Sequence, residues 1–315
     1  MTIRPLLFTL ALTACTGSDG TDTSTPIDTD TDTDTAVEPT PVWTEYRSGT
    51  STTFNGVYAS GDGVYLVGTS GDAYVGGAGI GWTDMSPPLE DEDLTDMWGA
   101  GAGDTLRIVA TATGGNIATF SGGSWTIEDI GTSDHQGIGG SSQDTLFAVS
   151  FGGVYAWDGI AWAYETLPDD ERLNDVFAIG GDAFAVGEAG AIVRRTDGTW
   201  AAIESGVSVA LNAVAGTTMT DVWAVGDEGT ALHFDGTVWT ATDTGVTETL
   251  WAVFAPDANH VYAVGNNGVA LLWNGAEWTS LPTGVANNLY AVHGASNVNV
   301  WAVGNRGEAL QYKAE

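Results

Sequence analysis

The chain has 315 residues, of which 41 are acidic and 8 are basic, and its formal net charge at pH 7 is −33. This balance disfavours nucleic acid as a partner, because binding to nucleic acid depends on Lys and Arg side chains that neutralise phosphates. It also disfavours electrostatic adhesion to anionic lipid. A cationic partner, calcium, or solubility alone are the remaining explanations for the charge.

A short apolar segment opens the chain. The run Leu6–Leu12 follows a basic residue and is followed by small residues and by Cys15, the single cysteine. We interpret residues 1–14 as an export signal. Leu12-Thr13-Ala14-Cys15 resembles the lipobox of bacterial lipoproteins, which implies a lipid on Cys15 and a membrane anchor without a spanning helix. In that family's sorting rule, Thr16 after the cysteine implies the outer rather than the inner membrane. The alternative is an ordinary signal peptide with a leftover thiol.

Residues 15–41 are predicted to be a disordered tether rich in Thr and Asp. Their central sequence, TDTSTPIDTDTDTDT, is nearly free of apolar residues, and Thr16–Pro41 carries acidic but no basic side chains. Such a segment cannot bury enough apolar surface to fold, and its charges repel one another. The alternating aspartates lack the glycine-turn spacing of a calcium loop, so a spacer is the simpler interpretation.

Residues 42–315 repeat one sequence motif. Val222–Thr240 reads VWAVGDEGTALHFDGTVWT, Val261–Thr279 reads VYAVGNNGVALLWNGAEWT, and another copy starts at Val300. The glycine that closes the AVG triplet recurs at intervals of 39 residues: Gly187, Gly226, Gly265 and Gly304. Self-similarity at a fixed period in this range indicates a repeat architecture.

One repeat contains four short runs of β-branched and aromatic residues. These are Val222–Val225, Ala231–Phe234, Val238–Thr240 and Leu250–Phe254. Asp235-Gly236, between the second and third runs, predicts a two-residue hairpin turn with positive φ at both positions. No segment has a helical period. Four antiparallel strands in about 40 residues are typical of one β-propeller blade.

The tryptophan of the outer strand gives the number of blades. It occurs seven times: Trp43, Trp82, Trp125, Trp162, Trp200, Trp239 and Trp278. Trp43 lacks the three strands that should precede it, and the last repeat ends near Tyr312 without its tryptophan strand. We therefore predict an all-β, seven-bladed propeller of four-stranded antiparallel blades. The strand near Trp43 would pair with the Gln311 region and close the ring, leaving no open sheet edge.

Two candidate sites follow from this architecture. Connections between blades share one face with the turns between second and third strands, and this face would collect carboxylates, which suit calcium. The candidate metal ligands are Glu90, Asp91, Glu92 and Asp93, and the same face would carry Asp169-Asp170-Glu171, Glu188 and Asp227-Glu228. Solvated acidic loops are the simpler explanation, because a run of charges specifies no ligand geometry. No cofactor other than calcium is expected.

The second candidate site is the residue that follows the leucine position of the inner strand. Its members vary in chemical type: Asn174, Asn212, Trp251 and Tyr290. We expect this position at the mouth of the central channel, where Trp251 and Tyr290, on neighbouring blades, could stack on a sugar or on an aromatic side chain of a peptide. The alternative is that both rings pack between blades.

Catalytic motifs are absent from the sequence. The four histidines are scattered, without a pair at metal-ligand spacing, and the glycine-rich runs do not open a helix. No GxSxG elbow occurs. The sequence therefore predicts a non-catalytic protein.

The pattern AVG–xxG–xxLxxxDGxxW resembles the repeats of photosystem II assembly/stability-factor propellers, which belong with the BNR/Asp-box group. Arg195–Trp200 and Phe234–Trp239 keep the Asp-Gly and Trp of the Asp-box hairpin but lack its leading serine. The repeat also resembles tectonin repeats, a group that includes glycan and lipopolysaccharide binders. The first resemblance implies a protein-interaction or assembly scaffold, and the second implies a lectin-like binder of surface glycan. A sialidase-like glycoside hydrolase is a distant alternative.

We expect a monomer at the bacterial cell envelope, periplasmic or surface-exposed, that binds an unidentified protein or surface glycan and contacts the membrane only through its lipid. Two features of the channel and one of the propeller surface would separate the hypotheses. A cluster of arginines or carboxylates in the channel would favour an enzyme, exposed aromatic rings there would favour a lectin, and a bare acidic face would favour a scaffold.

Overall fold

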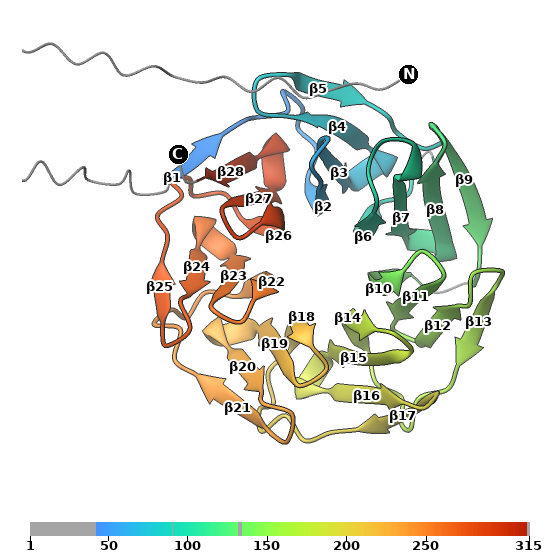
Figure 1. Ribbon diagram of the computed structural model, residues 1–315, viewed down its shortest axis with the longest axis vertical. Coiled ribbons are helices and arrows are strands. Elements are labelled where there is room, and N and C mark those ends of the chain that lie inside the picture. The colour runs from blue at the N-terminus through green and yellow to red at the C-terminus, as the bar shows by residue number, and fades with distance from the viewer. Residues whose placement is uncertain (1–41, 90, 132–133, 314–315) are drawn as a thin grey trace, which may run out of the picture. The chain divides into compact units, whose positions relative to one another are not determined.

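The computed structural model describes residues 42–89, 91–131 and 134–313. These residues form seven four-stranded antiparallel sheets arranged in a ring (Figure 1), so the predicted all-β propeller is confirmed. Within those ranges, the helices are single 3-10 turns, and none has the length and apolar character needed to cross a bilayer. The predicted signal segment 1–14, Cys15, the tether 15–41 and Glu90 lie outside the described residues.

The blades follow one another along the chain, and the last is completed by the first strand. Blade 1 consists of β2 Phe54–Ala59, β3 Val64–Gly68, β4 Ala73–Gly77 and β5 Gly81–Asp84, and blade 2 of β6 Leu94–Ala100, β7 Arg107–Ala112, β8 Asn116–Ser121 and β9 Ser124–Asp129. Blade 3 consists of β10 His135–Ser142, β11 Thr145–Ser150, β12 Gly153–Trp157 and β13 Trp162–Glu165, and blade 4 of β14 Leu173–Ile179, β15 Asp182–Gly187, β16 Ile192–Thr196 and β17 Thr199–Ala202. Blade 5 consists of β18 Leu211–Thr218, β19 Asp221–Gly226, β20 Ala231–Phe234 and β21 Trp239–Thr242, and blade 6 of β22 Leu250–Asp257, β23 His260–Gly265, β24 Ala270–Trp273 and β25 Trp278–Ser280. Blade 7 consists of β26 Leu289–Ser296, β27 Asn299–Gly304 and β28 Ala309–Lys313, followed on its outer side by β1 Val42–Glu45. The 3-10 turns are η1 Thr69–Gly71, η2 Gly103–Thr105, η3 Thr113–Gly115, η4 Glu188–Gly190, η5 Asp227–Gly229, η6 Asn266–Gly268 and η7 Asn305–Gly307.

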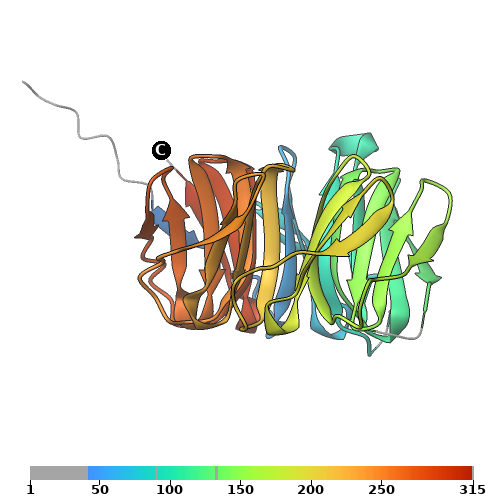
Figure 2. The same cartoon turned by 90° about the horizontal axis from the view of Figure 1, so that it is seen from below.

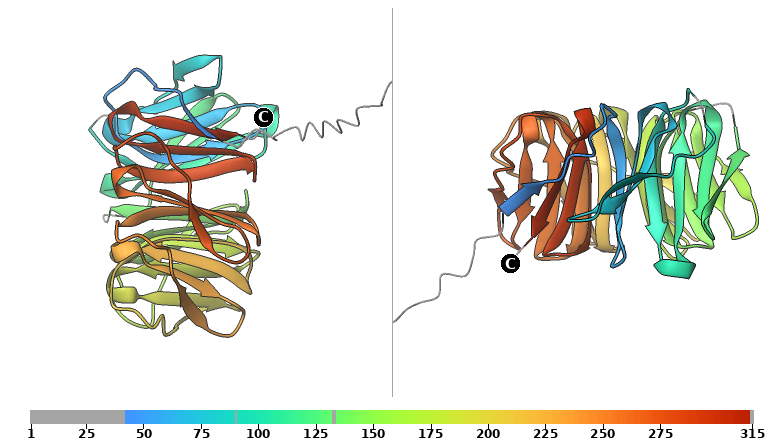
Figure 3. Two further views of the ribbon diagram at one scale, coloured as in Figure 1. Left: turned by 90° about the vertical axis from the view of Figure 1, so that its left-hand side faces the viewer. Right: turned by 90° about the horizontal axis from the view of Figure 1, so that it is seen from above.

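The first strand of each blade lies innermost and the fourth lies outermost (Figure 1). The repeat seen in the sequence is offset from this unit by one strand, because the run at Leu250–Phe254 starts blade 6 rather than completing blade 5. Side views show the sheets standing upright and packing face to face around the ring (Figures 2 and 3).

The hydrophobic core lies between blades rather than inside any one of them. One buried cluster joins Phe184 and Val186 of blade 4 to Leu211, Leu232 and Trp239 of blade 5. Neighbouring pairs of blades form similar clusters around the ring. A single blade therefore cannot bury its own faces, which is the physical basis of repeat folds.

The glycine of the AVG triplet is required by close approach of two chain segments. At Gly226 the φ angle is −167°, an extended conformation that any residue adopts. A Cβ atom at this position would lie 2.0 Å from the carbonyl oxygen of Ala210, just before the inner strand of the same blade. The turn that follows is left-handed at Glu228 (φ 57°) and Gly229 (φ 69°), which explains the second glycine of the motif.

The prediction for Asp235-Gly236 is wrong in detail. A four-residue loop, 235–238, joins β20 to β21, and only Gly236 in it has positive φ. The Asp235 carboxylate organises the loop by accepting backbone N–H groups from Thr237 (2.8 Å) and Val238 (3.0 Å). The Thr237 hydroxyl, followed by these amides, lowers the pKa of Asp235 to about 2. The two-residue turn does occur in blade 4, where Asp197-Gly198 has positive φ at both positions.

The ring closes as the sequence predicts. β1 pairs with β28 in antiparallel register, with Trp43 opposite Tyr312. Beyond β1, the Tyr46 amide donates to the Ala309 carbonyl (2.7 Å), and Arg47 lies 3.3 Å from the carboxylate of Glu308. The two ends of the propeller therefore share one sheet, and the described part of the ring is held shut by main-chain hydrogen bonds.

The repeated outer tryptophan connects neighbouring blades. The indole N–H of Trp82 donates to the Tyr46 carbonyl (2.9 Å), and that of Trp278 donates to the Thr242 hydroxyl (3.0 Å). The Trp200 indole donates to the Glu165 carboxylate (2.7 Å). In each of these three cases the acceptor belongs to the preceding blade. The indole N–H groups of Trp43 and Trp239 are buried without a hydrogen-bond partner among the described residues, so packing between blades rather than the hydrogen bond is what the position shares.

One blade breaks the pattern of its inner strand. The residue that starts this strand is Phe or Leu in six blades and His135 in blade 3, and all seven are fully buried. Neither ring nitrogen of His135 makes a hydrogen bond of normal geometry among the described residues. Burial lowers the pKa of His135, although the backbone of Gly115 lies close enough to raise the pKa of the ring and partly offset its burial. The ring is therefore held neutral at a cost in folding free energy.

We predict that Gly226→Ala lowers the free energy of unfolding by about 1–3 kcal/mol, because the added methyl group forces the Ala210 carbonyl to move. Equilibrium unfolding in urea measures the change. Gly61→Ala is the matched control, since its new Cβ would have no atom within 4 Å. Equal stability of the two variants would contradict this account of the repeat.

We predict that His135→Leu raises the free energy of unfolding by about 1–2 kcal/mol, because it removes two unpaired buried nitrogens. The gain should grow as pH falls below about 6.5, where an unfolded histidine binds a proton and the buried one does not. Thermal melts at pH 5 and pH 8 measure both effects. The reciprocal variant Leu173→His should have a lower free energy of unfolding than the wild type. If the stability of His135→Leu varied with pH in the same way as that of the wild type, this explanation would be refuted.

Candidate functional site

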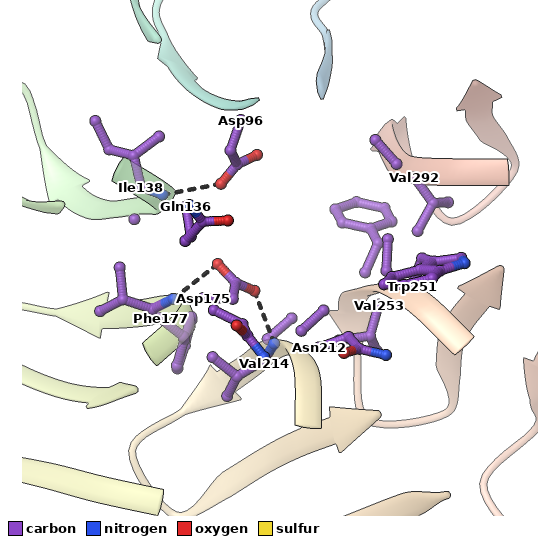
Figure 4. Close-up of a pocket in the computed structure, with 18 of the residues that line it drawn as sticks. Asp96, Gln136, Ile138, Asp175, Phe177, Asn212, Val214, Trp251, Val253 and Val292 are labelled. Atoms are coloured by element: carbon purple, nitrogen blue, oxygen red, sulfur yellow. Dashed lines mark hydrogen bonds between the residues drawn. The ribbon is translucent and has the colours of Figure 1, made fainter. Parts of the chain in front are cut away.

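The inner strands surround a central channel with a cavity of about 750 Å³ (Figures 1 and 4). Every inner strand has a β-bulge directly after its first residue, as between Leu211 and Ala213. Such a bulge re-aims the side chain inside it. The bulged residues all line the channel: Asn55, Thr95, Gln136, Asn174, Asn212, Trp251 and Tyr290. The four residues predicted at the channel mouth are therefore brought together on its wall.

Asn174 and Asn212 connect neighbouring blades. The Asn174 side-chain amide donates to the Leu211 carbonyl of the next blade (2.9 Å), and the Asn212 amide donates to the Leu250 carbonyl (3.0 Å). Asn55 and Thr95 donate equivalent hydrogen bonds from blades 1 and 2. We refer to these four side-chain-to-carbonyl hydrogen bonds as the inner ties. This gives Asn174 and Asn212 a role in holding the ring.

Trp251 and Tyr290 occupy the tie position in blades 6 and 7 without forming a tie. The Trp251 indole donates to Asn266 of its own blade (2.7 Å), and the Tyr290 hydroxyl accepts from Asn288, two residues earlier (3.2 Å). The ring centroids lie 5.9 Å apart at 61°. Trp251 is 36% exposed, and Phe151, which also lines the channel, is 45% exposed. The channel therefore has an aromatic wall that faces solvent.

Asp96 and Asp175 also line the channel, and the sequence reasoning missed them. They follow the tie position in blades 2 and 4, where the other blades have Gly or Ala. Asp96 accepts the N–H of Ile138 in the next blade (2.9 Å), and Asp175 accepts that of Val214 (2.8 Å), as Figure 4 shows. Each also accepts the N–H of its own following residue. An acidic residue at a position otherwise limited to Gly and Ala was the available signal.

The surroundings of the two aspartates shift their pKa values upward. Both side chains are half-buried. Burial raises the pKa of Asp96 to about 7, although the hydrogen bonds from the backbone N–H groups of Ile138 and Met97 act in the opposite direction. Burial, and then repulsion from Asp96, raise the pKa of Asp175 well above its ordinary value. The two carboxyl groups therefore act as a pair that retains protons near neutral pH.

The rest of the channel supplies no positive charge. Among the described residues that line it there is no lysine or arginine, whereas Glu188 and Asp227 add carboxylates. Burial lowers the pKa of His293 to about 4, so this ring is neutral at pH 7. Its Nδ1 atom accepts the N–H of Ala59 in blade 1 (3.1 Å). The channel is therefore lined by carboxyl groups and aromatic rings, with the carboxyl groups of Asp96 and Asp175 on blades 2 and 4 and the Trp251–Tyr290 pair on blades 6 and 7.

The acidic loop predicted to bind metal makes structural hydrogen bonds. Glu92 accepts from the Asn116 side chain (2.9 and 3.0 Å), and Asp93 accepts the N–H of Ser70 (2.8 Å). Asp91 has a left-handed backbone (φ 69°). In residues 42–89, 91–131 and 134–313, no group of three or more His, Cys, Asp or Glu side chains could hold a metal ion. Calcium binding with Glu90 remains a prediction.

No family model matches the chain, and no curated protein matches it in sequence. Solved structures match it in fold. YCF48 bound to a D1 peptide is 15% identical with a TM-score of 0.70, and covers 87% of this chain and 97% of its own. YCF48 from Cyanidioschyzon merolae is 16% identical with a TM-score of 0.70, and covers 86% and 99%. The fold that the photosystem II assembly-factor resemblance implies is thereby confirmed.

Propellers of other kinds match as well. The WD40 repeats of RRP9 are 10% identical with a TM-score of 0.74, and cover 87% of this chain and 99% of their own. Virginiamycin B lyase from Staphylococcus aureus is 11% identical with a TM-score of 0.69, and covers 87% and 99%. One of these neighbours is an enzyme, so the shared fold does not decide activity.

We predict that wild-type stability falls relative to that of Asp96→Asn as pH rises from about 4 to about 7, and that the difference is constant above this range. The unfolded aspartate ionises near pH 3.9, whereas the folded one ionises near 7, so deprotonation favours the unfolded chain in this window. Urea unfolding at each pH measures the difference. Asp235→Asn, whose wild-type carboxyl has its pKa lowered to about 2, should show a flat difference from pH 5 to 8. A flat difference for Asp96→Asn would contradict the assignment.

Proposed function

We propose that the protein is a non-catalytic scaffold that binds a protein partner at the mouth of its central channel. The observation that carries this proposal is the Trp251–Tyr290 pair, two aromatic rings that take the tie position in blades 6 and 7; within the described residues, Gln136 of blade 3 forms no tie either, but adds no ring. Rings in the channel are the feature expected of a lectin, but they serve equally to contact the apolar side chains of a protein segment. An inner tie connects two blades, whereas Trp251, at 36% exposed, bonds within its own blade and leaves apolar area accessible to a partner. The fold neighbours support a binding role, since one of them is a complex with a peptide and another consists of WD40 repeats.

We further propose that the protein is held at the bacterial cell envelope by a lipid on Cys15, with residues 15–41 as a spacer. The lipobox resemblance and the acidic, apolar-poor composition of the spacer support this placement. Cys15→Ser should move the protein from the membrane fraction to the soluble fraction of a bacterial host. Continued sedimentation with membranes at high salt would count against a lipid anchor.

A surface glycan is the second candidate ligand. Solvent-accessible aromatic rings are suited to stacking on sugars, and the exposed Trp251 and the half-buried Tyr290 provide two of them on adjacent blades. The carboxyl pair of Asp96 and Asp175 raises the alternative of a glycoside hydrolase, which uses two carboxyl groups. Both aspartates are already engaged by backbone N–H groups of two blades, which favours a positioning role in the wall over acid/base chemistry.

We predict that the purified full-length chain captures a specific protein from native membranes, and that Trp251→Ala plus Tyr290→Ala reduces capture at least about 10-fold, because these rings form the centre of the contact. Tyr164→Ala is the control, since this ring is 53% exposed on an outer strand. A glycan array and a panel of aryl glycosides are run in parallel. Saccharide binding without a protein partner would replace the scaffold by a lectin, and turnover of a glycoside would overturn the non-catalytic assignment.

A further inference from the structure

The two channel aspartates are not needed to close the ring. Each bonds to the next blade, but the equivalent position is Gly56, Gly137, Ala213, Ala252 or Ala291 elsewhere, and those blades pack without a carboxylate. The sequence therefore places two carboxyl groups in the channel wall at a cost that the fold does not require. Half-buried carboxyl groups with raised pKa values disfavour folding at neutral pH.

Among the described residues that line the channel, no cationic side chain pairs with these two carboxyl groups; the nearby Arg172 stacks on the Phe151 ring of the lining at 5.5 Å. Elsewhere in the ring, the half-buried carboxylate of Glu165 is paired with Arg195 at 2.7 Å. Asp96 and Asp175 receive only backbone N–H groups, and the described lining of the channel holds no Lys or Arg. A positive group that entered the channel would replace the retained proton and pair with the carboxylates.

The aromatic wall suits the same kind of ligand. Trp251 and Tyr290 line the channel on blades 6 and 7. Figure 4 shows Trp251 across the channel from Asp96 and Asp175 of blades 2 and 4. Aromatic rings attract cationic side chains through their faces and cover the apolar stems of those side chains. Residues 41–315 contain 34 of the 41 acidic residues and 7 of the 8 basic ones, since 7 acidic residues and one basic residue precede them. The whole propeller therefore attracts a cation before contact.

Resting on the proposed function, we propose that the channel selects a partner segment by one lysine or arginine, whose charged end reaches Asp96 and Asp175 while the rest of the segment packs on Trp251 and Tyr290. A metal ion is a poorer occupant, because the described residues contain no group of three or more metal-ligating side chains. The cavity of about 750 Å³ has room for a side chain with its flanking residues.

The test is a selection with a random heptapeptide phage library on the immobilised full-length chain, with counter-selection on Trp251→Ala plus Tyr290→Ala. The selected peptides should share a lysine or arginine. Citrulline in place of arginine, or acetyl-lysine in place of lysine, removes the charge and should weaken binding to the wild type at least about 10-fold. Isothermal titration calorimetry on synthetic peptides measures this ratio.

The role of the aspartates is tested by the double variant Asp96→Asn plus Asp175→Asn. This variant should bind the peptide with lysine or arginine and its uncharged counterpart with nearly equal affinity, so that the ratio of the two affinities is close to one. The control is Asp169→Asn plus Asp170→Asn, which removes two carboxyl groups, and at least as much negative charge, from exposed residues outside the channel lining and should keep the ratio. Near-ultraviolet circular dichroism checks that both variants are folded. An equal fall in the ratio for the control pair would reduce the effect to net charge and overturn the proposal.

Wild-type binding as a function of pH is a measurement that needs no variant. Affinity for the charged peptide should rise between pH 6 and pH 8 with release of a proton, because the cation displaces the one retained by the pair. The other groups facing the channel are Glu188 and Asp227, Tyr290, and His293, which is already neutral in this range. Affinity that is independent of pH would contradict the proposal.

The outcomes separate this inference from the proposed function. Failure to select any peptide that depends on Trp251 and Tyr290 would defeat both. Peptides whose binding depends on the two rings but that contain no basic residue would be consistent with the proposed scaffold function. They would contradict only the proposal that the channel selects a lysine or arginine. Spermidine is the probe for a free amine: spermidine binding that requires Asp96 and Asp175, without peptide binding, would replace the partner segment by a small polyamine.

Discussion

Burial between neighbouring sheets is the constraint on which the rest of this structure depends. Each blade has two apolar faces and can cover them only with the blades on either side, so a chain with two free ends would expose both terminal faces and both sheet edges. Closure through β1 and β28 removes that exposure. Hydrogen bonds from outer tryptophans and the inner ties connect neighbouring blades at two radii of the ring, and both kinds occur between blades 5 and 6.

The close approach at the AVG glycine transmits this constraint to the channel. The carbonyl of Ala210 lies where a Cβ of residue 226 would be, which fixes the chain directly before the inner strand of blade 5. The bulge follows at once, and it turns Asn212 into the channel. A glycine in the second strand thus helps to determine which side chain the first strand presents to a ligand.

Much of the fold could be predicted because its signals are local and repeated. The period, the turn glycines and the count of outer tryptophans define the blades, and the incomplete repeats at Trp43 and Tyr312 define the closure. The turn at Asp235-Gly236 was less predictable, because an aspartate side chain can organise a longer loop without positive φ. The tie made by Asn174 depends on a carbonyl 37 residues away, and no pattern within one repeat reveals it.

The aspartates of the channel show where the reasoning from repeats stops and why function is found there. A repeat identifies what the blades share, and what they share is needed to pack them. Because several inner ties and a continuous interblade core hold the ring, single blades can dispense with a tie or carry a strained carboxyl group without opening it. Blades 6 and 7 match the repeat closely elsewhere, yet they replace the tie with Trp251 and Tyr290. Such departures occur where the bulge points the side chain into the shared cavity. Because the ring has more ties than it needs to stay closed, these positions can vary and can determine which ligand is bound.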